Sequence, residues 1–202
     1  MKLPGFFWGM VFLVVTVATP AAAEDTHFTD QFKKGSDSFG IQAGLGFTEN
    51  IPTGRDRTDI TFLFLFPNYQ YNLTGLMGSS WYQGAWNWHL EAGAATILNR
   101  DGEKLLGISP LMFQYKFLNP KRKWAPSFLL GAGASWTDWD EPANRELGGE
   151  FQFLLHGGVG LEYFLDSWSY SINYRMLHIS NAGTDTPNLG LNSHVFTLGL
   201  QF

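Results

Sequence analysis

The sequence predicts an all-β protein, an eight-stranded antiparallel transmembrane β-barrel. Three observations predict it. Eight segments alternate between apolar and small or polar residues, the N-terminus has the pattern of an export signal, and aromatic residues and glycine are abundant, with 18 Phe, 8 Trp, 7 Tyr and 23 Gly among 202 residues. Aromatic girdles and a lumen lined by small residues are typical of membrane barrels. We therefore expect strands that cross the outer membrane of a Gram-negative bacterium.

Residues 1–23 have the pattern of a Sec signal peptide. Lys2 supplies a positive charge, residues 6–17 are almost continuously apolar, and residues 21–23 are alanines that suit cleavage. The apolar stretch is shorter than the ~20 residues that a membrane-spanning helix needs. An uncleaved N-terminal anchor is the alternative. We expect residues 1–23 to be removed and residues 24–202 to form one barrel domain.

The composition argues against several kinds of function. The chain has no cysteine, which leaves no disulfide framework and no thiolate metal ligand. No spacing typical of a metal site occurs, and we expect neither a metal nor another cofactor. The formal net charge is −5 and no basic stripe is present, so nucleic acid is not an expected partner.

Eight segments alternate with a period of two, as strands with two different faces do. They lie at residues 39–47, 60–66, 86–93, 111–117, 127–136, 151–163, 168–180 and 194–202. Most are long enough to cross a bilayer as tilted strands of about 9–11 residues. We expect the apolar face of each segment to point outward, including the face formed in the second segment by Ile60, Phe62, Phe64 and Phe66.

A soluble β-sandwich is the alternative, because it shows the same alternation. Aromatic residues such as Trp86 and Trp136 stand at segment ends, as girdles at the membrane surfaces require. Charges such as Glu91 and Arg175 lie on the polar face, where they can pair inside a lumen. The chain also stops on Phe202 after alternating apolar residues, which resembles the C-terminal assembly signal of outer-membrane barrels. These features favour the membrane barrel, whose closed sheet leaves no strand edge in lipid.

An even number of strands places both chain ends on the periplasmic side. We expect short periplasmic turns at residues 119–123 and 166–167, and extracellular connections at residues 48–57, 99–103, 137–149 and 181–191. Residues 74–83 are long for a periplasmic turn and indicate a small excursion or a misplaced boundary. Five ionisable residues with lumenal parity are expected to form a structural network, namely His89, Glu91, His156, Glu162 and Arg175.

The end of the seventh segment carries a candidate hydrolytic pair. His178 and Ser180 are two residues apart, so they share the outward face with backbones about 6.6 Å apart. Side chains at this spacing can form the Ser–His hydrogen bond that activates a hydroxyl nucleophile. The eighth segment is the hairpin neighbour and places Asn192 beside His178. A polar loop without catalysis is the alternative interpretation of residues 180–190.

The same region resembles a known family. The patterns His-x-Ser-Asn-Ala-Gly at residues 178–183 and Pro-Asn-x-Gly at residues 187–190 are similar to the C-terminal signature of the PagL family, the outer-membrane lipid A 3-O-deacylases. The resemblance implies an eight-stranded barrel with its active site on the outer wall. It also implies hydrolysis of the ester-linked acyl chain at the 3-position of lipid A, so that lipopolysaccharide is the expected substrate. The sequence does not decide between a monomer and a homodimer.

The resemblance also implies residue roles. Ser180 is the implied nucleophile and His178 the implied general base, while the Gly183 N–H and the Asn188 side chain are implied oxyanion donors. Asn181 is expected to act beside Gly183 and Asn188, as an oxyanion donor or a positioning residue.

One position departs from the family pattern, because Asn192 stands where the family has the acidic member of the triad. An amide oxygen can still hold a histidine ring, as in Cys-His-Asn enzymes, but it carries no charge. Asp185 and His194 are near in sequence without matching the family position. A catalytically impaired or non-catalytic lipid-binding barrel is therefore the alternative function.

Overall fold

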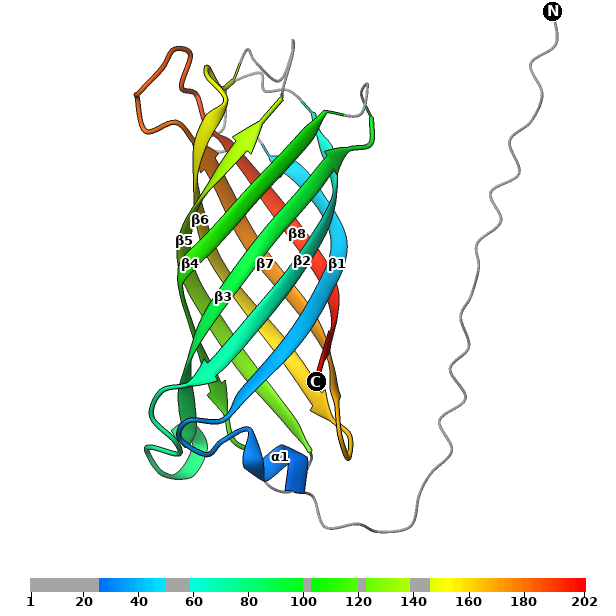
Figure 1. The fold of residues 1–202 in the computed structure, drawn as a ribbon, viewed down its shortest axis with the longest axis vertical. Coiled ribbons are helices and arrows are strands. Elements are labelled where there is room, and N and C mark those ends of the chain that lie inside the picture. Colours follow the sequence, from blue (N-terminus) through cyan, green and yellow to red (C-terminus); the bar gives the residue numbers. More distant parts are fainter. Residues whose placement is uncertain (1–25, 50–58, 100–102, 120–122, 139–145) are drawn as a thin grey trace, which may run out of the picture.

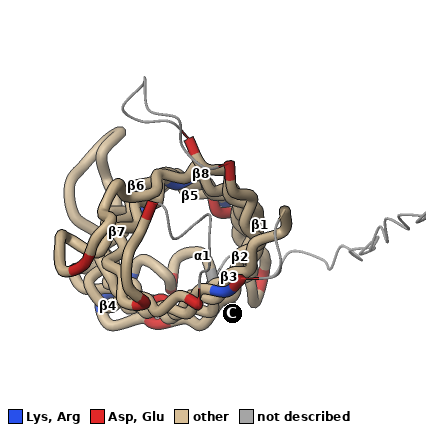
Figure 2. The backbone as a smooth tube through the Cα atoms, turned by 90° about the horizontal axis from the view of Figure 1, so that it is seen from above, with Lys and Arg blue, Asp and Glu red and all other residues tan. Residues whose placement is uncertain are grey.

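The computed structural model describes residues 26–49, 59–99, 103–119, 123–138 and 146–202. Within them the chain forms a closed antiparallel barrel in which each strand pairs with the next and β8 pairs back with β1. The strands are β1 (Asp37–Glu49), β2 (Thr61–Asn72), β3 (Gly84–Ile97), β4 (Lys104–Phe117), β5 (Trp124–Thr137), β6 (Phe151–Phe164), β7 (Ser169–Ser180) and β8 (Leu191–Gln201). Figure 1 shows the tilted strands, and Figure 2 shows the closed ring from above. The predicted fold class is confirmed.

The signal peptide expected at residues 1–23 lies outside the described residues. A short helix, α1 (Thr26–Asp30), follows and closes one end of the barrel (Figure 1). Phe28 and Phe32 pack there against Phe164 with ring centroids 5.0 and 6.4 Å apart. Among the described residues, no helix is long and apolar enough to cross a membrane.

The strands are longer than the alternation predicted. β2 continues for six residues beyond Phe66, because its lumenal positions there are polar residues buried inside the barrel, including Asn68, Gln70 and Asn72. The connection from β2 to β3 is the small excursion anticipated for residues 74–83. It contains a 3-10 helix, η1 (Ser80–Tyr82), and a bridge between Met77 and Gly84.

The predicted outward face of the second segment is wrong. Its apolar residues are buried in the lumen, namely Ile60, Phe62, Phe64 and Phe66. Between residues 60 and 66 both faces are apolar, so hydropathy does not distinguish them there. The register does, because Phe64 pairs with Gly44 and Phe62 pairs with Gly46 on β1, and paired residues share a face. Gly46 leaves space for the Phe64 ring, because a Cβ on Gly46 would lie 2.5 Å from it.

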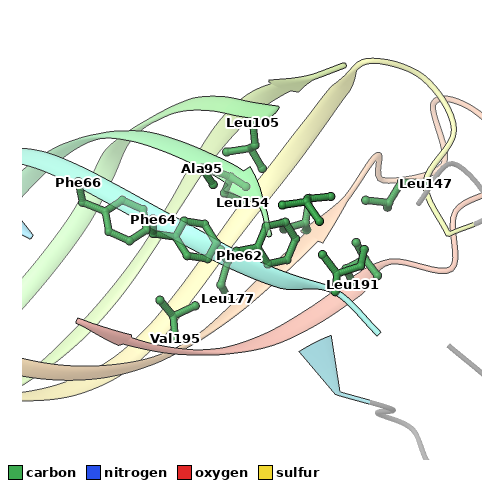
Figure 3. Packing of buried hydrophobic residues seen from close by; sticks show 13 residues of the cluster. Phe62, Phe64, Phe66, Ala95, Leu105, Leu147, Leu154, Leu177, Leu191 and Val195 are labelled. Atoms are coloured by element: carbon green, nitrogen blue, oxygen red, sulfur yellow. The ribbon is translucent and has the colours of Figure 1, made fainter. Parts of the chain in front are cut away.

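These rings belong to an apolar cluster that fills one half of the lumen (Figure 3). The cluster also takes in Leu177 and Ile179 of β7 and Leu191 of β8, whose exposed fractions are 1%, 0% and 0%. These three residues alternate along their strands with the candidate catalytic residues. The inner face of the candidate site is therefore a packed core. Close packing of these lumenal side chains holds the backbone of β7 and β8 in place beneath the candidate catalytic residues.

The other half of the lumen contains the expected charge network. Arg175 donates to both carboxylate oxygens of Glu91, at 2.7 and 3.1 Å, and Lys116 lies 2.6 Å from Glu162. The Ser169 hydroxyl donates to Glu162. Each charge is buried with its partner, which offsets the cost of removing both from water. The five residues predicted to face the lumen are all buried there, and Glu91, Glu162 and Arg175 are paired as expected.

Candidate active site

The candidate catalytic residues stand together on the outer face of β7 and β8. His178 and Ser180 are the last outward residues of β7, and Asn192 is the second residue of β8, directly opposite His178. All three are half-buried, while the residues between them are buried in the lumen. The structure thus brings together the three residues that alternation and the hairpin predicted to be neighbours.

A hydrogen bond to Asn192 orients the His178 ring. Its Nδ1 lies 2.8 Å from Oδ1 of Asn192. An amide oxygen can only accept, so Nδ1 carries the proton and donates. In a neutral imidazole the other nitrogen, Nε2, then has a lone pair and can take a proton from a hydroxyl group. The Asn192 amide thus selects the tautomer that a general base needs.

Gly190 borders the Nε2 side of this ring. Its φ is +68°, and a Cβ built on it would lie 2.9 Å from Cε1 and 3.5 Å from Nε2 of His178. A side chain at this position would displace the ring. The sequence motif contains Gly190, but this contact across the hairpin is visible only in the structure.

Ser180 is opposite Phe153 of β6, and His178 is opposite Leu155 of the same strand. Among the described residues, the Ser180 hydroxyl has no hydrogen-bond partner, so the expected bond to His178 is not formed in this structure. Catalytic hydrogen bonds are often long in the absence of substrate, and the shared face keeps the pair within reach. Phe153 and Leu155 are 38% and 54% exposed, so an apolar surface borders the pair.

Asn181 organises the loop that follows Ser180. It is fully buried, and its Nδ2 donates to the carbonyl oxygens of Gly148, Asp185 and Pro187 at 2.9 to 3.1 Å. Its Oδ1 accepts from the Gly183 N–H at 2.9 Å. The expected oxyanion donor at Gly183 is thus engaged within the loop, while Asn181 has the geometry of a positioning residue.

Asn181 also holds the side chain of Asn188. Its Oδ1 accepts from the Asn181 N–H at 3.2 Å, and this contact leaves the Nδ2 end of the amide for another acceptor. The segment before β6 reinforces the loop, because the Gly148 N–H donates to Pro187 and the Leu189 N–H donates to Glu146. No pattern in the sequence predicts these contacts, since the two segments are about 40 residues apart and neither alternates.

A second polar group lies on the same face, next to Asn192. Glu49 of β1 is opposite Asn192, and its carboxylate accepts from Nε2 of His194. The Nδ1 of His194 lies 2.7 Å from the Tyr174 hydroxyl. Sequence reasoning missed Glu49, because the closure of β1 onto β8 joins residues from the two ends of the chain.

Asp185, considered as a substitute acid, accepts instead from the Thr186 N–H at 2.7 Å within the loop. No group of three or more His, Cys, Asp and Glu residues that could hold a metal ion occurs in the described part of the chain.

Comparisons with known proteins support the assignment of a family. A family model described as lipid A 3-O-deacylase (PagL) matches residues 54–201. The crystal structure of the outer membrane enzyme PagL is similar, with 21% identity, a TM-score of 0.61 and coverage of 81% of this chain and 98% of that one. Neisserial surface protein A (NspA) is also similar in fold, with 12% identity, a TM-score of 0.56 and coverage of 82% and 95%. No curated protein sequence matches significantly.

Proposed function

Because this chain belongs to the lipid A 3-O-deacylase (PagL) family of the Gram-negative outer membrane, we propose that it hydrolyses the 3-O-linked acyl ester of lipid A through Ser180 and His178. The family assignment gives the reaction class, ester hydrolysis on lipopolysaccharide. The identity of the catalytic residues and their position on a lipid-facing wall are parts of the proposal.

The observation that carries the proposal is the hydrogen bond between His178 and Asn192. It leaves Nε2 of His178 as the proton-accepting nitrogen, and Ser180 is two residues along the same face of β7. A hydroxyl, a base and a group that orients the base thus occur in the order that acyl transfer by a serine requires.

The proposed reaction has two halves. Ser180 Oγ attacks the ester carbonyl carbon while its proton moves to Nε2 of His178. The tetrahedral intermediate collapses, the 3-hydroxyl of the sugar leaves with the proton from His178, and an acyl-enzyme remains. Water then attacks the acyl-enzyme with His178 as base, which releases the fatty acid and restores Ser180.

The oxyanion of each intermediate needs donors near Ser180. In the proposal the Nδ2 group of Asn188 supplies one, because its Oδ1 is already held by the backbone. The Gly183 N–H supplies a second when it turns from Asn181, and Asn181 holds the loop in place. Each such donor contributes about 10²–10³ in kcat where it has been measured in other enzymes.

The substrate is amphipathic, and the outer face suits it. Phe153 and Leu155 are exposed beside the catalytic pair, and an acyl chain in the outer leaflet packs against them while its ester lies near Ser180. An active site on the outer wall is reached directly from the membrane and needs no path through the filled lumen.

The test is deacylation of purified lipid A in detergent, followed by mass spectrometry. We expect loss of the 3-O-linked chain with the wild type, and none with Ser180→Ala or His178→Ala. Ser167→Ala, in the exposed turn between β6 and β7 at the opposite end of the barrel, is the matched control and retains full activity. Folding of each variant is checked by the heat-dependent electrophoretic mobility of the barrel. Equal product from wild type and Ser180→Ala rules out the proposed nucleophile.

A second candidate function is a lipid-binding barrel with little or no catalysis. Asn192 favours it, because an amide cannot neutralise the imidazolium that forms during the reaction. In serine proteases, exchange of the acid for an amide lowers kcat by about 10⁴. This candidate predicts that wild-type protein releases no acyl chain while it still binds lipid A.

A further inference from the structure

A carboxylate occurs one strand away from the position where the triad acid is missing. His178, Asn192 and Glu49 form one row across β7, β8 and β1, with Asn192 in the middle. Residues directly opposite on antiparallel strands have Cβ atoms about 4.5–5.5 Å apart. Asn192 therefore has the base on one side and an acid on the other.

Glu49 points to the outer face, as Asn192 does. It follows the exposed residue Phe47 at the same parity along β1. Its carboxylate bonds to His194, the next outward residue of β8 after Asn192. A diagonal contact of this kind lies within reach of a long side chain. Glu49 thus has its charged end on the same wall as the catalytic pair.

The two ends of the Asn192 amide are chemically different. Its Oδ1 lies 2.8 Å from Nδ1 of His178, so the Nδ2 group is the end of the amide that is not bonded to His178. An ionised carboxylate can only accept hydrogen bonds. Glu49 is therefore the neighbour that suits the Nδ2 end, and it disfavours the flipped amide, which would turn an oxygen toward a carboxylate.

From this row we infer that Glu49 is a positioning residue of the active site, which acts on His178 through Asn192. The carboxylate fixes the Asn192 amide, the amide fixes the protonated Nδ1 of His178, and Nε2 is left as the acceptor for Ser180. The inference rests on the proposed function for its catalytic consequence. Glu49 supplies the negative charge that position 192 lacks, from the neighbouring strand β1.

His194 and Tyr174 hold this carboxylate in place. Nε2 of His194 donates to Glu49, so in a neutral ring Nδ1 accepts from the Tyr174 hydroxyl at 2.7 Å. The His194 and Tyr174 rings stack with centroids 5.8 Å apart and planes at 24°. A carboxylate on an apolar wall needs such donors, since an unpaired charge there is unfavourable.

The first test is Glu49→Gln, which keeps the size of the side chain and removes its charge and its acceptor-only character. We expect kcat on lipid A to fall roughly 10- to 100-fold with KM little changed, because the substrate does not touch Glu49. Glu49→Asp restores part of the loss. Asp59→Asn, an exposed acid beside β2 at the same end of the barrel, is the control and keeps wild-type kcat.

The second test is independent of turnover. In protein with ¹⁵N-labelled histidine, the His178 signal is assigned from its loss in His178→Ala. We expect the chemical shifts of an Nδ1–H tautomer in the wild type and of a mixture in Glu49→Gln. A purely structural role of Glu49 would leave this signal unchanged.

The outcomes separate the inference from the function it rests on. Wild-type protein without deacylase activity removes the proposed function, and the histidine tautomer then decides the role of Glu49 alone. If the wild type is active and a folded Glu49→Gln variant retains its kcat, the inference is wrong. The same tautomer in wild type and Glu49→Gln also overturns it.

Discussion

Nδ1 of His178 lies 2.8 Å from Oδ1 of Asn192, the residue directly opposite it on the neighbouring strand. The chain belongs to the lipid A 3-O-deacylase (PagL) family, and in the proposed mechanism His178 is the base that activates Ser180. The amide at position 192 orients the base without a charge. In the proposed mechanism, activity therefore depends on the hydrogen bond between Asn192 and His178 and on the residues that surround Asn192.

We predict that Asn192→Ala lowers kcat by about 10²–10⁴, because His178 loses the acceptor that selects its tautomer. Asn192→Glu provides a charged acceptor but places it directly opposite Glu49, and like charges in such a pair are destabilising. The double variant Asn192→Glu/Glu49→Gln should then have a higher kcat than Asn192→Glu alone. Steady-state deacylation of lipid A by the four proteins measures this, and a double variant slower than Asn192→Glu contradicts the prediction.

Gly190→Ala is expected to impair catalysis through the base. The new Cβ would lie 2.9 Å from Cε1 of His178 and must displace the ring, in addition to straining a residue with φ of +68°. The strain alone costs about 1–2 kcal/mol. Gly35→Ala is the matched control, since Gly35 has φ of +85° and its nearest neighbour is 3.7 Å away near the far end of the barrel.

Both glycine variants should lose similar stability in urea titrations, but only Gly190→Ala should lose most of its kcat. Equal activity of the two variants would show that the contact with His178 has no catalytic consequence.

Asn181→Ala should loosen the loop after Ser180. The substitution removes the donor that the carbonyl oxygens of Gly148, Asp185 and Pro187 share. Gly148 still accepts from Gln152 and Pro187 from the Gly148 N–H. The Asp185 carbonyl loses its donor, and an unsatisfied group of this kind costs about 1–3 kcal/mol when it is buried. We expect faster hydrogen exchange at residues 181–190 and 146–149 by mass spectrometry, together with lower kcat. Asn99→Ala, which breaks contacts to Asp59 and Thr61, is the control and should change exchange only near β2 and β3. Unchanged exchange at residues 146–149 would speak against this role of Asn181.

Much of this site was predictable because strand geometry is regular. Alternation with a period of two put His178 and Ser180 on one face, and the hairpin put Asn192 beside them. Glu49 and Gly148 were not predictable in this way. Both reach the site through contacts between segments far apart in the chain, Glu49 by closure of the barrel and Gly148 by packing of two loops. Neither event leaves a local pattern in the sequence.

The alternation of apolar and polar residues also predicted the fold, but it assigned the wrong face to residues 60–66. Alternation predicts the face of a strand only when the two faces differ in polarity, as in β7, where Arg175 is buried and Ile172 is exposed. In residues 60–66, where β2 begins, both faces are apolar, and the shape of the neighbouring strand determines which face is lumenal. Gly46 of β1 leaves the lumenal side of this strand pair with space for the Phe64 ring.

Filling the space between Gly46 and the Phe64 ring should destabilise the barrel. In Gly46→Ala the new Cβ would lie 2.5 Å from the ring of Phe64, and overpacking of this kind costs about 1–3 kcal/mol. Phe64→Ala alone leaves a cavity, which costs about 3–5 kcal/mol. In Gly46→Ala/Phe64→Ala the added methyl group meets no ring, so the double variant should be less destabilised than the two single changes together. Urea unfolding of the barrel in detergent measures the four free energies. Strict additivity would mean that Gly46 does not make room for Phe64, and the face of β2 would then need another cause.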